Sequence, residues 1–418
     1  TSVFDYRTNQ WQRIDEMVNG RWYPGSVALP NGQIFTGLGE GGGQYPEIWS
    51  PGQGWSLLNG ANLQTPILNY TGYQSNWLPY FHLTANGQIF HSGPTQQMNW
   101  INPTGNGSIT AAGLTNTWYP KYSTVVMYDE GKLLMAGGAV DNTSTAVGTN
   151  KAATIDLTGA TPRMTAIASM TYARKFNNNV ILPTGEVIII GGNTSGTEFS
   201  DSGTILTPEI WNPDTKAWRS VADMSVPRNY HSVALLMQDG RIWSGGGGLC
   251  ACSADHPDAQ IYSPPYLFNA DGSLATRPTI SSAPAVAVVG QRINVQATAG
   301  LQKFSLIKIT AETHHQNSDL RYLRPAFVEQ SSGQYQVTLH SNQSVLTPGY
   351  WMLFGVNSQG VPSVAKVIQI VHNAIVITNP GAQSSIQGAS VNLPMVARDV
   401  NGAALTYSAT GLPAGLTI

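Results

Sequence analysis

A hairpin-like pattern that recurs five times constrains the fold of this chain more than any other feature. Each copy has an apolar run, a polar–glycine turn, a second apolar run and a closing glycine. The copies span residues 26–39, 81–94, 125–138, 179–192 and 232–248. Their closing glycines, at 39, 93, 138, 192 and 246, lie 54, 45, 54 and 54 residues apart. Repetition at this length predicts a Kelch-type β-propeller with one four-stranded blade in each repeat of about 50 residues.

The composition agrees with an all-β chain of short strands. Of its 418 residues, 44 are glycine and 25 are proline, which suits many turns rather than long helices. The alternative is an all-β sandwich throughout, but a sandwich does not repeat at blade length. We therefore predict that residues 1–278 form the propeller.

The two ends of the chain carry their own patterns. The segment 2–6, followed by Trp11, is typical of the last strand of a blade, so we expect the chain to begin inside a blade. Residues 279–372 show short alternating strands with frequent turns and predict one immunoglobulin-like β-sandwich. Residues 373–418 resemble part of a second immunoglobulin-like module. Further domains of the same protein are therefore expected at both ends.

Charge and apolar runs exclude two classes of partner. The chain has 21 basic and 23 acidic residues, a net charge of −2, and no basic run that would follow a phosphate backbone. No apolar stretch reaches the roughly 18 residues that a membrane-spanning helix needs. We predict neither nucleic-acid binding nor a membrane span.

The cellular location is indicated by several weak signals. Two cysteines, Cys250 and Cys252, are too few for a disulfide framework. Asn-x-Ser/Thr triplets, which are potential glycosylation sites, begin at Asn69, Asn106, Asn142, Asn193 and Asn342. Together with the low lysine content, these signals favour a secreted or cell-surface protein.

Tyrosine and histidine side chains are the candidates for chemistry. Tyr230 and His231 stand at the entrance to the fifth hairpin, and Tyr23 holds the same place before the first. Inner strands of a propeller begin near its axis, so such positions from different blades converge, and imidazole and phenolate together suit copper(II). For any one of these residues a packing role is the alternative. His314, in a loop of the sandwich segment, carries no signal of its own.

Several longer motifs resemble the galactose oxidase and glyoxal oxidase family of copper radical oxidases. They are Tyr230-His-Ser, Asp239-Gly-Arg, Gly245-Gly-Gly-Gly-Leu-Cys250, Asp258-Ala-Gln-Ile-Tyr-Ser-Pro-Pro-Tyr266-Leu, Leu274-Ala-Thr-Arg-Pro278, Pro348-Gly-Tyr-Trp-Met-Leu-Phe354 and Gly360-Val-Pro-Ser-Val-Ala365. Weaker similarity extends over residues 1–372. The resemblance implies a seven-bladed propeller followed by the sandwich.

The resemblance also implies a site. One copper would be held by Tyr230 as axial ligand, by His231 and His314, and by Tyr23 as the equatorial tyrosine that becomes a radical. His315 would be the neighbour that does not bind, although a shift of one residue stays open. In the reaction that the family performs, Tyr230 takes the alcohol proton, Tyr23 takes a hydrogen atom from the carbinol carbon, and dioxygen becomes hydrogen peroxide.

Two departures concern sulfur. The family links its radical tyrosine to a cysteine through a thioether, and no cysteine precedes Cys250 here. A truncated chain is the expectation, with a lost cross-link as the alternative, and in the first case the 418 residues alone would not be a competent radical oxidase. The family spaces its loop cysteines CxxC, whereas Cys250-Ala-Cys252 is tighter, so a disulfide between them is left open.

The remaining departures concern the substrate. The aromatic residue that stacks on the family's cross-link falls near Gly41, the arginine that binds galactose falls near Gln74, and Phe199 matches an apolar pocket position. Without that arginine, small alcohols, aldehydes or other glycans are more plausible substrates than galactose.

Two functions follow from the sequence. The first is an extracellular copper radical oxidase that converts a primary alcohol or hydrated aldehyde to the aldehyde or acid while O2 becomes H2O2. The alternative is a non-catalytic surface or matrix-assembly protein that keeps the propeller and immunoglobulin-like modules for binding.

Overall fold

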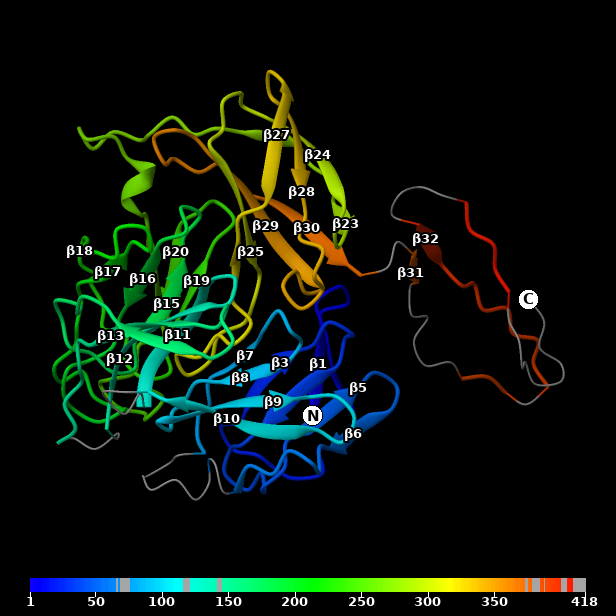
Figure 1. Ribbon diagram of the computed structural model, residues 1–418, viewed down its shortest axis with the longest axis horizontal. Helices are drawn as coiled ribbons and strands as arrows, with labels where there is room; N and C mark the ends of the chain where they lie inside the picture. The colour runs from blue at the N-terminus through cyan, green and yellow to red at the C-terminus, as the bar shows by residue number, and fades with distance from the viewer. Residues whose placement is uncertain are drawn as a thin grey trace.

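The computed structural model describes residues 1–64, 67, 76–115, 121–140, 145–372, 375–377, 384–386, 388–399 and 404–408. Its described residues form antiparallel sheets almost throughout, with one 3-10 turn, η2 (Pro265–Leu267). The strands of the propeller lie below the sandwich in Figure 1, and a small hairpin lies apart from both. This arrangement agrees with the predicted all-β architecture.

Five sheets follow one another as blades, and each begins with one of the hairpins predicted from the repeat. The first blade has β3 (Gly25–Ala28), β4 (Ile34–Gly37), β5 (Glu47–Ser50) and β6 (Gly54–Leu57). The second has β7 (Phe81–Leu83), β8 (Ile89–His91), β9 (Gln97–Asn102) and β10 (Ser108–Leu114). The third has β11 (Lys121–Asp129), β12 (Lys132–Ala139), β13 (Ala152–Asp156) and β14 (Arg163–Ala166).

The last two blades differ in strand number. The fourth has β15 (Asn178–Ile181), β16 (Val187–Ile190), β17 (Glu209–Trp211) and β18 (Trp218–Ser220). The fifth has three strands, β19 (Val233–Leu236), β20 (Ile242–Gly245) and β21 (Ala259–Tyr262). Three-residue loops that end in a left-handed glycine close inner hairpins of the first and fourth blades, at Gly32 (φ 83°) and Gly185 (φ 88°).

The N-terminal segment differs from its prediction. A single closing strand was expected over residues 2–6, but β1 (Ser2–Asp5) and β2 (Gln10–Arg13) pair with each other as a hairpin. Phe4 and Trp11 are directly opposite in this ladder, and their rings lie 5.2 Å apart. Trp11 is thus the cross-strand partner of the first strand, an aromatic pairing that stabilises a two-stranded sheet.

Two sheets form the sandwich. One contains β22 (Ile280–Ser282), β24 (Arg292–Ala297), β28 (Gln334–Thr338) and β27 (Ala326–Ser331). The other contains β23 (Val286–Val288), β30 (Lys366–Val371), β29 (Gly349–Val356), β25 (Lys303–Lys308) and β26 (Tyr322–Leu323). Beyond them, β31 (Ile375–Ile377) pairs with β32 (Ala397–Asp399). The boundaries at 278 and 372 stay predictions.

An apolar interface joins the sandwich to the propeller. Ile307 of β25 and Met352 and Phe354 of β29 belong to the same buried cluster as Leu134, Ile189 and Trp211 of the third and fourth blades. Because β25 leads directly into the loop that carries His314, this interface sets where that loop enters the propeller.

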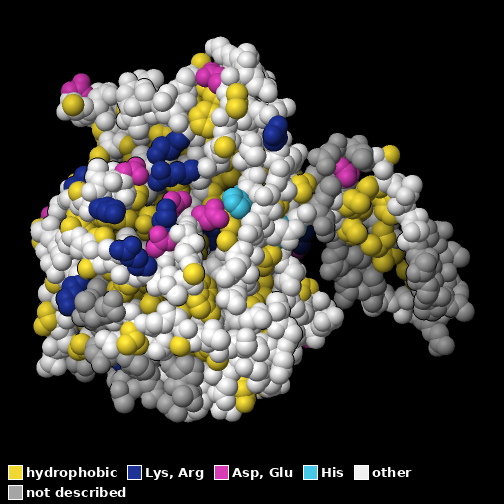
Figure 2. Space-filling model, in the orientation of Figure 1, with side chains coloured by type: hydrophobic (Ala, Val, Ile, Leu, Met, Phe, Trp, Pro, Cys, Tyr) yellow, Lys and Arg dark blue, Asp and Glu magenta, His cyan; other side chains and the backbone are white. Residues whose placement is uncertain are grey.

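Surface charges are sparse and mixed in sign. Figure 2 shows Lys and Arg side chains interspersed with Asp and Glu on the face in view, most of which is uncharged. No helix among the described residues is long and apolar enough to cross a membrane.

Buried ion pairs recur between the segment that leads into a blade and a strand of that blade. Arg174 donates from Nη2 to Glu209 Oε2 at 2.7 Å, and both side chains are inaccessible to solvent. Arg21 pairs in the same way with Glu47 at 2.7 Å. The buried Arg228 instead pairs at 2.8 Å with the exposed Asp258, which directly precedes β21. Each arginine also donates to a backbone carbonyl at the end of the inner hairpin. These pairs fix the entry segment against its own blade.

Breaking one of these pairs should destabilise the protein strongly. We expect Arg174→Met to lower the free energy of unfolding by about 3–5 kcal/mol, because Glu209 would be left as an unpaired buried charge. Arg13→Ala, at an exposed pair with Glu16, should change it by about 0.5 kcal/mol or less. Denaturant unfolding of both variants tests this, and equal effects would contradict it.

Two buried histidines in the second blade should make stability depend on pH. Burial lowers the pKa of His82 to about 3 and that of His91 to about 3, so both are neutral in the folded protein. The unfolded chain binds a proton near pH 6.5, so stability falls as pH falls from about 6.5 towards 3. Over that pH range, we expect the free energy of unfolding of the wild type to fall by about 1.4 kcal/mol per pH unit more than that of His82→Gln. The free energy of unfolding of both proteins is measured against pH with denaturant. The same pH dependence in both would show that folding does not keep His82 neutral.

Candidate metal centre

A left-handed residue lies just before the inner strand of four blades and at the second position of β11 in the third blade. These residues are Tyr23 (φ 57°), Leu78 (φ 52°), Tyr122 (φ 54°), Phe176 (φ 61°) and His231 (φ 69°). Non-glycine residues seldom adopt this conformation, so its recurrence at one place in each repeat marks a common turn towards the axis. The turn brings the leading side chains of different blades together.

In the fifth blade, one extra residue between the buried arginine and the left-handed residue brings two side chains to the propeller axis. In the first and fourth blades the left-handed residue comes two positions after the buried arginine, as in Arg21 to Tyr23. In the fifth blade it comes three positions after Arg228. Tyr230 and His231 therefore both reach the axis, and their rings lie 4.1 Å apart.

His314 reaches the same point from the sandwich. It lies in the loop between β25 and β26 and is itself left-handed (φ 50°). Glu312 fastens this loop to the fifth blade, because its carboxylate accepts a hydrogen bond from the Ala234 amide at 2.7 Å. Burial raises the pKa of Glu312 to about 8. At the base of the loop, Lys308 pairs with Asp319.

The four residues expected at a copper site come together. The ring of His314 lies 4.6 Å from that of Tyr23, 4.7 Å from that of His231 and 5.4 Å from that of Tyr230, between centroids. The hydroxyl of Tyr23 lies close enough to that of Tyr230 to raise its pKa. Two phenol oxygens and two imidazoles from three segments far apart in the sequence thus face one small volume.

The nitrogens of the two histidines are held ready for a ligand. His231 uses Nδ1 to bond the Gly248 carbonyl oxygen at 2.6 Å, so Nδ1 carries the proton and Nε2 keeps its lone pair. His314 uses Nδ1 to bond the Thr313 hydroxyl at 2.7 Å, and in the tautomer in which Nδ1 donates to that hydroxyl, Nε2 keeps its lone pair for a ligand. Burial, with the neighbouring His231, lowers the pKa of His314 to about 4, so the imidazole is neutral, as metal binding requires.

The environment of Tyr230 favours a neutral phenol when no cation is present. Burial raises its pKa above the ordinary value, and the hydrogen bond with Tyr23 raises it further. A bound cation reverses this preference, because a nearby positive charge stabilises phenolate.

Aromatic side chains enclose the two tyrosines. The ring of Phe199 lies 5.8 Å from that of Tyr230 and 5.7 Å from that of His231. Trp22 and Trp77 each lie 5.2 Å from Tyr23. Sequence reasoning did not single out these tryptophans as neighbours of the site, although Trp22 is adjacent to Tyr23 in the chain and Trp77 directly precedes the left-handed Leu78.

Two positions carried over from the resemblance offer no side chain for comparison. Gly41 is a left-handed glycine (φ 79°) and provides no aromatic ring. Gln74 lies outside the described residues.

His315 is buried away from the four. Its ring lies about 6 Å from those of Tyr122 and Phe176 and 6.4 Å from that of Tyr230. Its Nε2 has no hydrogen-bond partner among the described residues. His314, with its closer ring contacts, is the better placed of the two histidines.

A cavity adjoins the site. It has a volume of about 430 Å³ and is lined by Tyr23, Pro24, Leu78, Pro79, Thr313 and His314, among others. Tyr23 and His314 therefore both line a space large enough for a small organic molecule.

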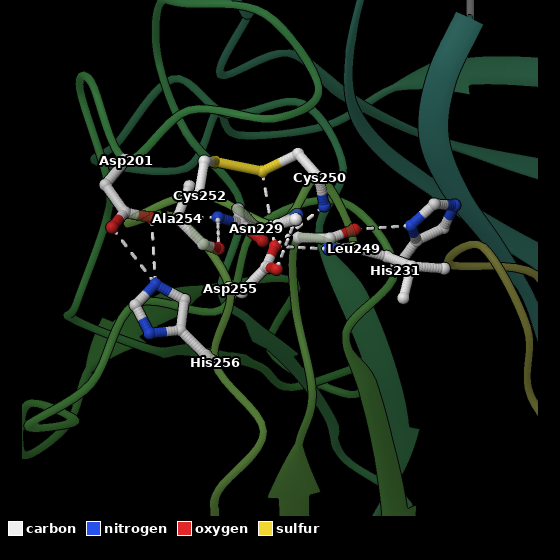
Figure 3. Close-up of a disulfide and its surroundings, with 11 residues drawn as sticks. Asp201, Asn229, His231, Leu249, Cys250, Cys252, Ala254, Asp255 and His256 are labelled. Carbon is white, nitrogen blue, oxygen red and sulfur yellow. Dashed lines mark hydrogen bonds and ion pairs between the residues drawn. A yellow bond between two sulfur atoms is a disulfide. The ribbon is translucent and has the colours of Figure 1, made fainter.

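The loop that follows β20 carries a disulfide. Cys250 and Cys252, whose oxidation state the sequence left open, are bonded to each other at 2.08 Å. Figure 3 shows this bond above Asp255, with His231 beside the loop.

Comparison with known proteins agrees with this architecture. Residues 3–251 match the family model described as glyoxal oxidase N-terminus, and residues 277–370 match the galactose oxidase-like early set domain. A galactose oxidase of Gibberella zeae is 35% identical over 88% of this chain, which spans 57% of that relative's length. An aldehyde oxidase GLOX of Vitis pseudoreticulata is 25% identical over 86% of this chain and 74% of its own.

A solved structure shares the fold. A fungal alcohol oxidase of the AA5 family, in complex with copper, superposes with a TM-score of 0.84 at 34% identity, covering 88% of this chain and 80% of its own. With the two family models, which together account for most of the sequence, this likeness establishes the relationship. The chain belongs to the galactose oxidase and glyoxal oxidase family.

Proposed function

We propose that this chain forms the site of a copper radical oxidase, which converts a primary alcohol or hydrated aldehyde to the aldehyde or acid and reduces O2 to H2O2. The observation that carries the proposal is the convergence of Tyr23, Tyr230, His231 and His314 around one volume. The oxidases among its relatives support the same reaction class.

The donor set fits copper. Two neutral imidazoles and two phenol oxygens are donors of the intermediate kind that copper(II) accepts. His231 and His314 offer Nε2, while Tyr23 and Tyr230 offer their phenol oxygens. When bound, copper supplies Lewis acidity and a one-electron redox couple.

Tyr230 and Tyr23 divide the chemistry. Tyr230, as phenolate, takes the hydroxyl proton of the substrate on its Oη and so acts as general base. Tyr23, as its one-electron oxidised phenoxyl, takes a hydrogen atom from the carbinol carbon on its oxygen. Both hydrogens and both electrons of the alcohol end on O2 as H2O2, so the overall reaction balances.

The surrounding rings support these roles. The rings of Phe199 and Phe176 pack beside that of Tyr230. Trp22 and Trp77 each make a T-shaped contact with the Tyr23 ring. The thioether that the family forms on its radical tyrosine requires a sulfur other than those of Cys250 and Cys252, which bond to each other.

We also propose that the protein is secreted or lies at the cell surface. The disulfide suits an oxidising compartment. Among the glycosylation triplets, Asn106 is exposed, whereas Asn193 is fully buried and cannot accept a glycan in the folded protein. Asn69 and Asn142 lie outside the described residues.

A non-catalytic surface or matrix-assembly protein is the alternative. It would bind no copper and release no peroxide with any alcohol or aldehyde. The named relatives of this chain do not favour this alternative, since they are oxidases.

Substitution of the ligands should separate binding from packing. We expect His231→Ala and His314→Ala each to weaken Cu(II) affinity by at least about 100-fold, more than the loss of an outer-shell partner costs. The matched control is His315→Gln, beside His314 but packed against Tyr122 and Phe176, which should retain one copper. Chelator competition and copper content measure this. Loss of copper from the His315 variant but not from the His314 variant would show that His315, and not His314, is the ligand.

The substrate prediction rests on the neutral side chain of Gln74. It cannot make the charged, forked contact that an arginine makes with sugar hydroxyls, so galactose should be oxidised more slowly than small alcohols or aldehydes. Peroxide release from the copper-loaded protein, with galactose, glyoxal-type aldehydes and simple alcohols compared, tests this. Faster turnover of galactose would contradict it.

A further inference from the structure

We propose that Asp255 is a positioning residue for the metal centre, which orients His231 by fixing the peptide unit between Gly248 and Leu249. The inference rests on the proposed function, because it assigns His231 as a ligand. It concerns the loop of residues 246–256, drawn in Figure 3, and not the ligands themselves.

The Asp255 carboxylate binds three successive backbone amides. Oδ1 accepts from the amides of Leu249 at 2.6 Å and Cys250 at 2.8 Å, and Oδ2 accepts from that of Ala251 at 2.8 Å. Leu249 (φ 86°) and Ala251 (φ 56°) are both left-handed, which turns the amides inwards. Such concave amide arrangements are typical anion sites, and here the anion is a side chain of the same loop.

One rigid group connects this carboxylate to His231. The Leu249 N–H and the Gly248 C=O belong to the same planar peptide unit. Asp255 holds the N–H end, and His231 Nδ1 donates to the C=O end at 2.6 Å. A rotation of this plane would change the direction in which His231 presents Nε2, so the carboxylate controls the imidazole through a single peptide.

Gly248 is needed for this contact. Its φ is +82°, and a Cβ there would lie 2.3 Å from Asp255 Oδ1 and 2.4 Å from the Ala254 carbonyl oxygen. Its own amide, which belongs to the preceding peptide unit, donates to the Tyr230 carbonyl at 2.8 Å and so holds the backbone on the other side of the Gly248 Cα. The carboxylate can approach this backbone only because the residue has no side chain.

A second carboxylate attaches the same loop to the fourth blade. Asp201 accepts from Asn229 Nδ2 at 2.8 Å and bonds His256 Nε2 at 3.0 Å. The His256 amide donates to the Gly247 carbonyl at 3.0 Å. Asp255 directly precedes His256, so these bonds also fix the position of the Asp255 backbone between the fourth and fifth blades.

The charge of Asp255 also acts on the ligand. A carboxylate on the N–H of a peptide polarises it and makes the C=O a stronger acceptor. A stronger acceptor on Nδ1 makes the opposite nitrogen more basic, as second-shell partners of metal-bound histidines do. Asp255 should therefore affect both the direction and the basicity of His231 Nε2.

The test compares Asp255→Asn with a matched surface carboxylate. Asp271→Asn is the control, because Asp271 likewise accepts the amide and hydroxyl of Ser273 but lies on an exposed turn. In Asp255→Asn one oxygen becomes an N–H donor that faces a backbone amide. We expect this variant of the copper-loadable protein to bind Cu(II) 10–100-fold more weakly in chelator competition and to shift the Cu(II) electron paramagnetic resonance spectrum. Asp271→Asn should do neither.

A further variant separates the carboxylate from the disulfide. The double variant Cys250→Ser, Cys252→Ser keeps the three amide bonds to Asp255 and should weaken Cu(II) binding less than Asp255→Asn does. Equal losses in the two variants would overturn the assignment to the carboxylate, as would a twofold or smaller change in Asp255→Asn.

Nuclear magnetic resonance of the metal-free wild type supplies a readout that no variant's folding can disturb. His231 should carry its proton on Nδ1, and a proton on Nε2 would overturn the proposal. The outcomes also separate the two proposals. A wild type that takes up no copper contradicts the proposed function, whereas a wild type and Asp255→Asn that bind copper equally contradict only the positioning role.

Discussion

The apolar contact between the sandwich and the third and fourth blades is the interaction on which the site depends. Ile307, Met352 and Phe354 bury their side chains against these blades. Burial of each such side chain contributes roughly 1.5–3 kcal/mol, so the contact holds the two domains in one relative position. His314 follows β25 by six residues. This contact therefore sets the position from which the loop carries its imidazole to the tyrosines.

The site is also built from backbone conformations that cost free energy. Tyr23, His231 and His314 are all left-handed, each at a cost of order 1 kcal/mol or more. Surrounding structure offsets that cost: the buried arginine pairs fix the segments before Tyr23 and Tyr230, and Glu312 fixes the loop before His314. The carboxylates of Glu312 and Asp255 accept hydrogen bonds from backbone amides and so hold the loops beside His314 and His231 in place.

Much of the fold could be predicted from the sequence, because the repeat is a local pattern. Alternating apolar residues around a glycine turn dictate a hairpin, and all five hairpins are present. The N-terminal segment was mispredicted because four-residue strands carry too little pattern to distinguish one strand from two. Asn193 satisfied a glycosylation triplet, but the isolated bridge to Lys175 buries it at the turn into the fourth blade.

The sequence by itself determined the blades, their order and the residue types available at each inner strand, since these follow from patterns that are local in the chain. It also placed Tyr23, Tyr230 and His231 at equivalent entrances. Only the tertiary structure decided that His314, and not His315, faces them, because that choice depends on how a loop from another domain is anchored. The peptide that joins Asp255 to His231 likewise arises from folding, since its geometry depends on left-handed turns and a close approach that residue identity does not encode.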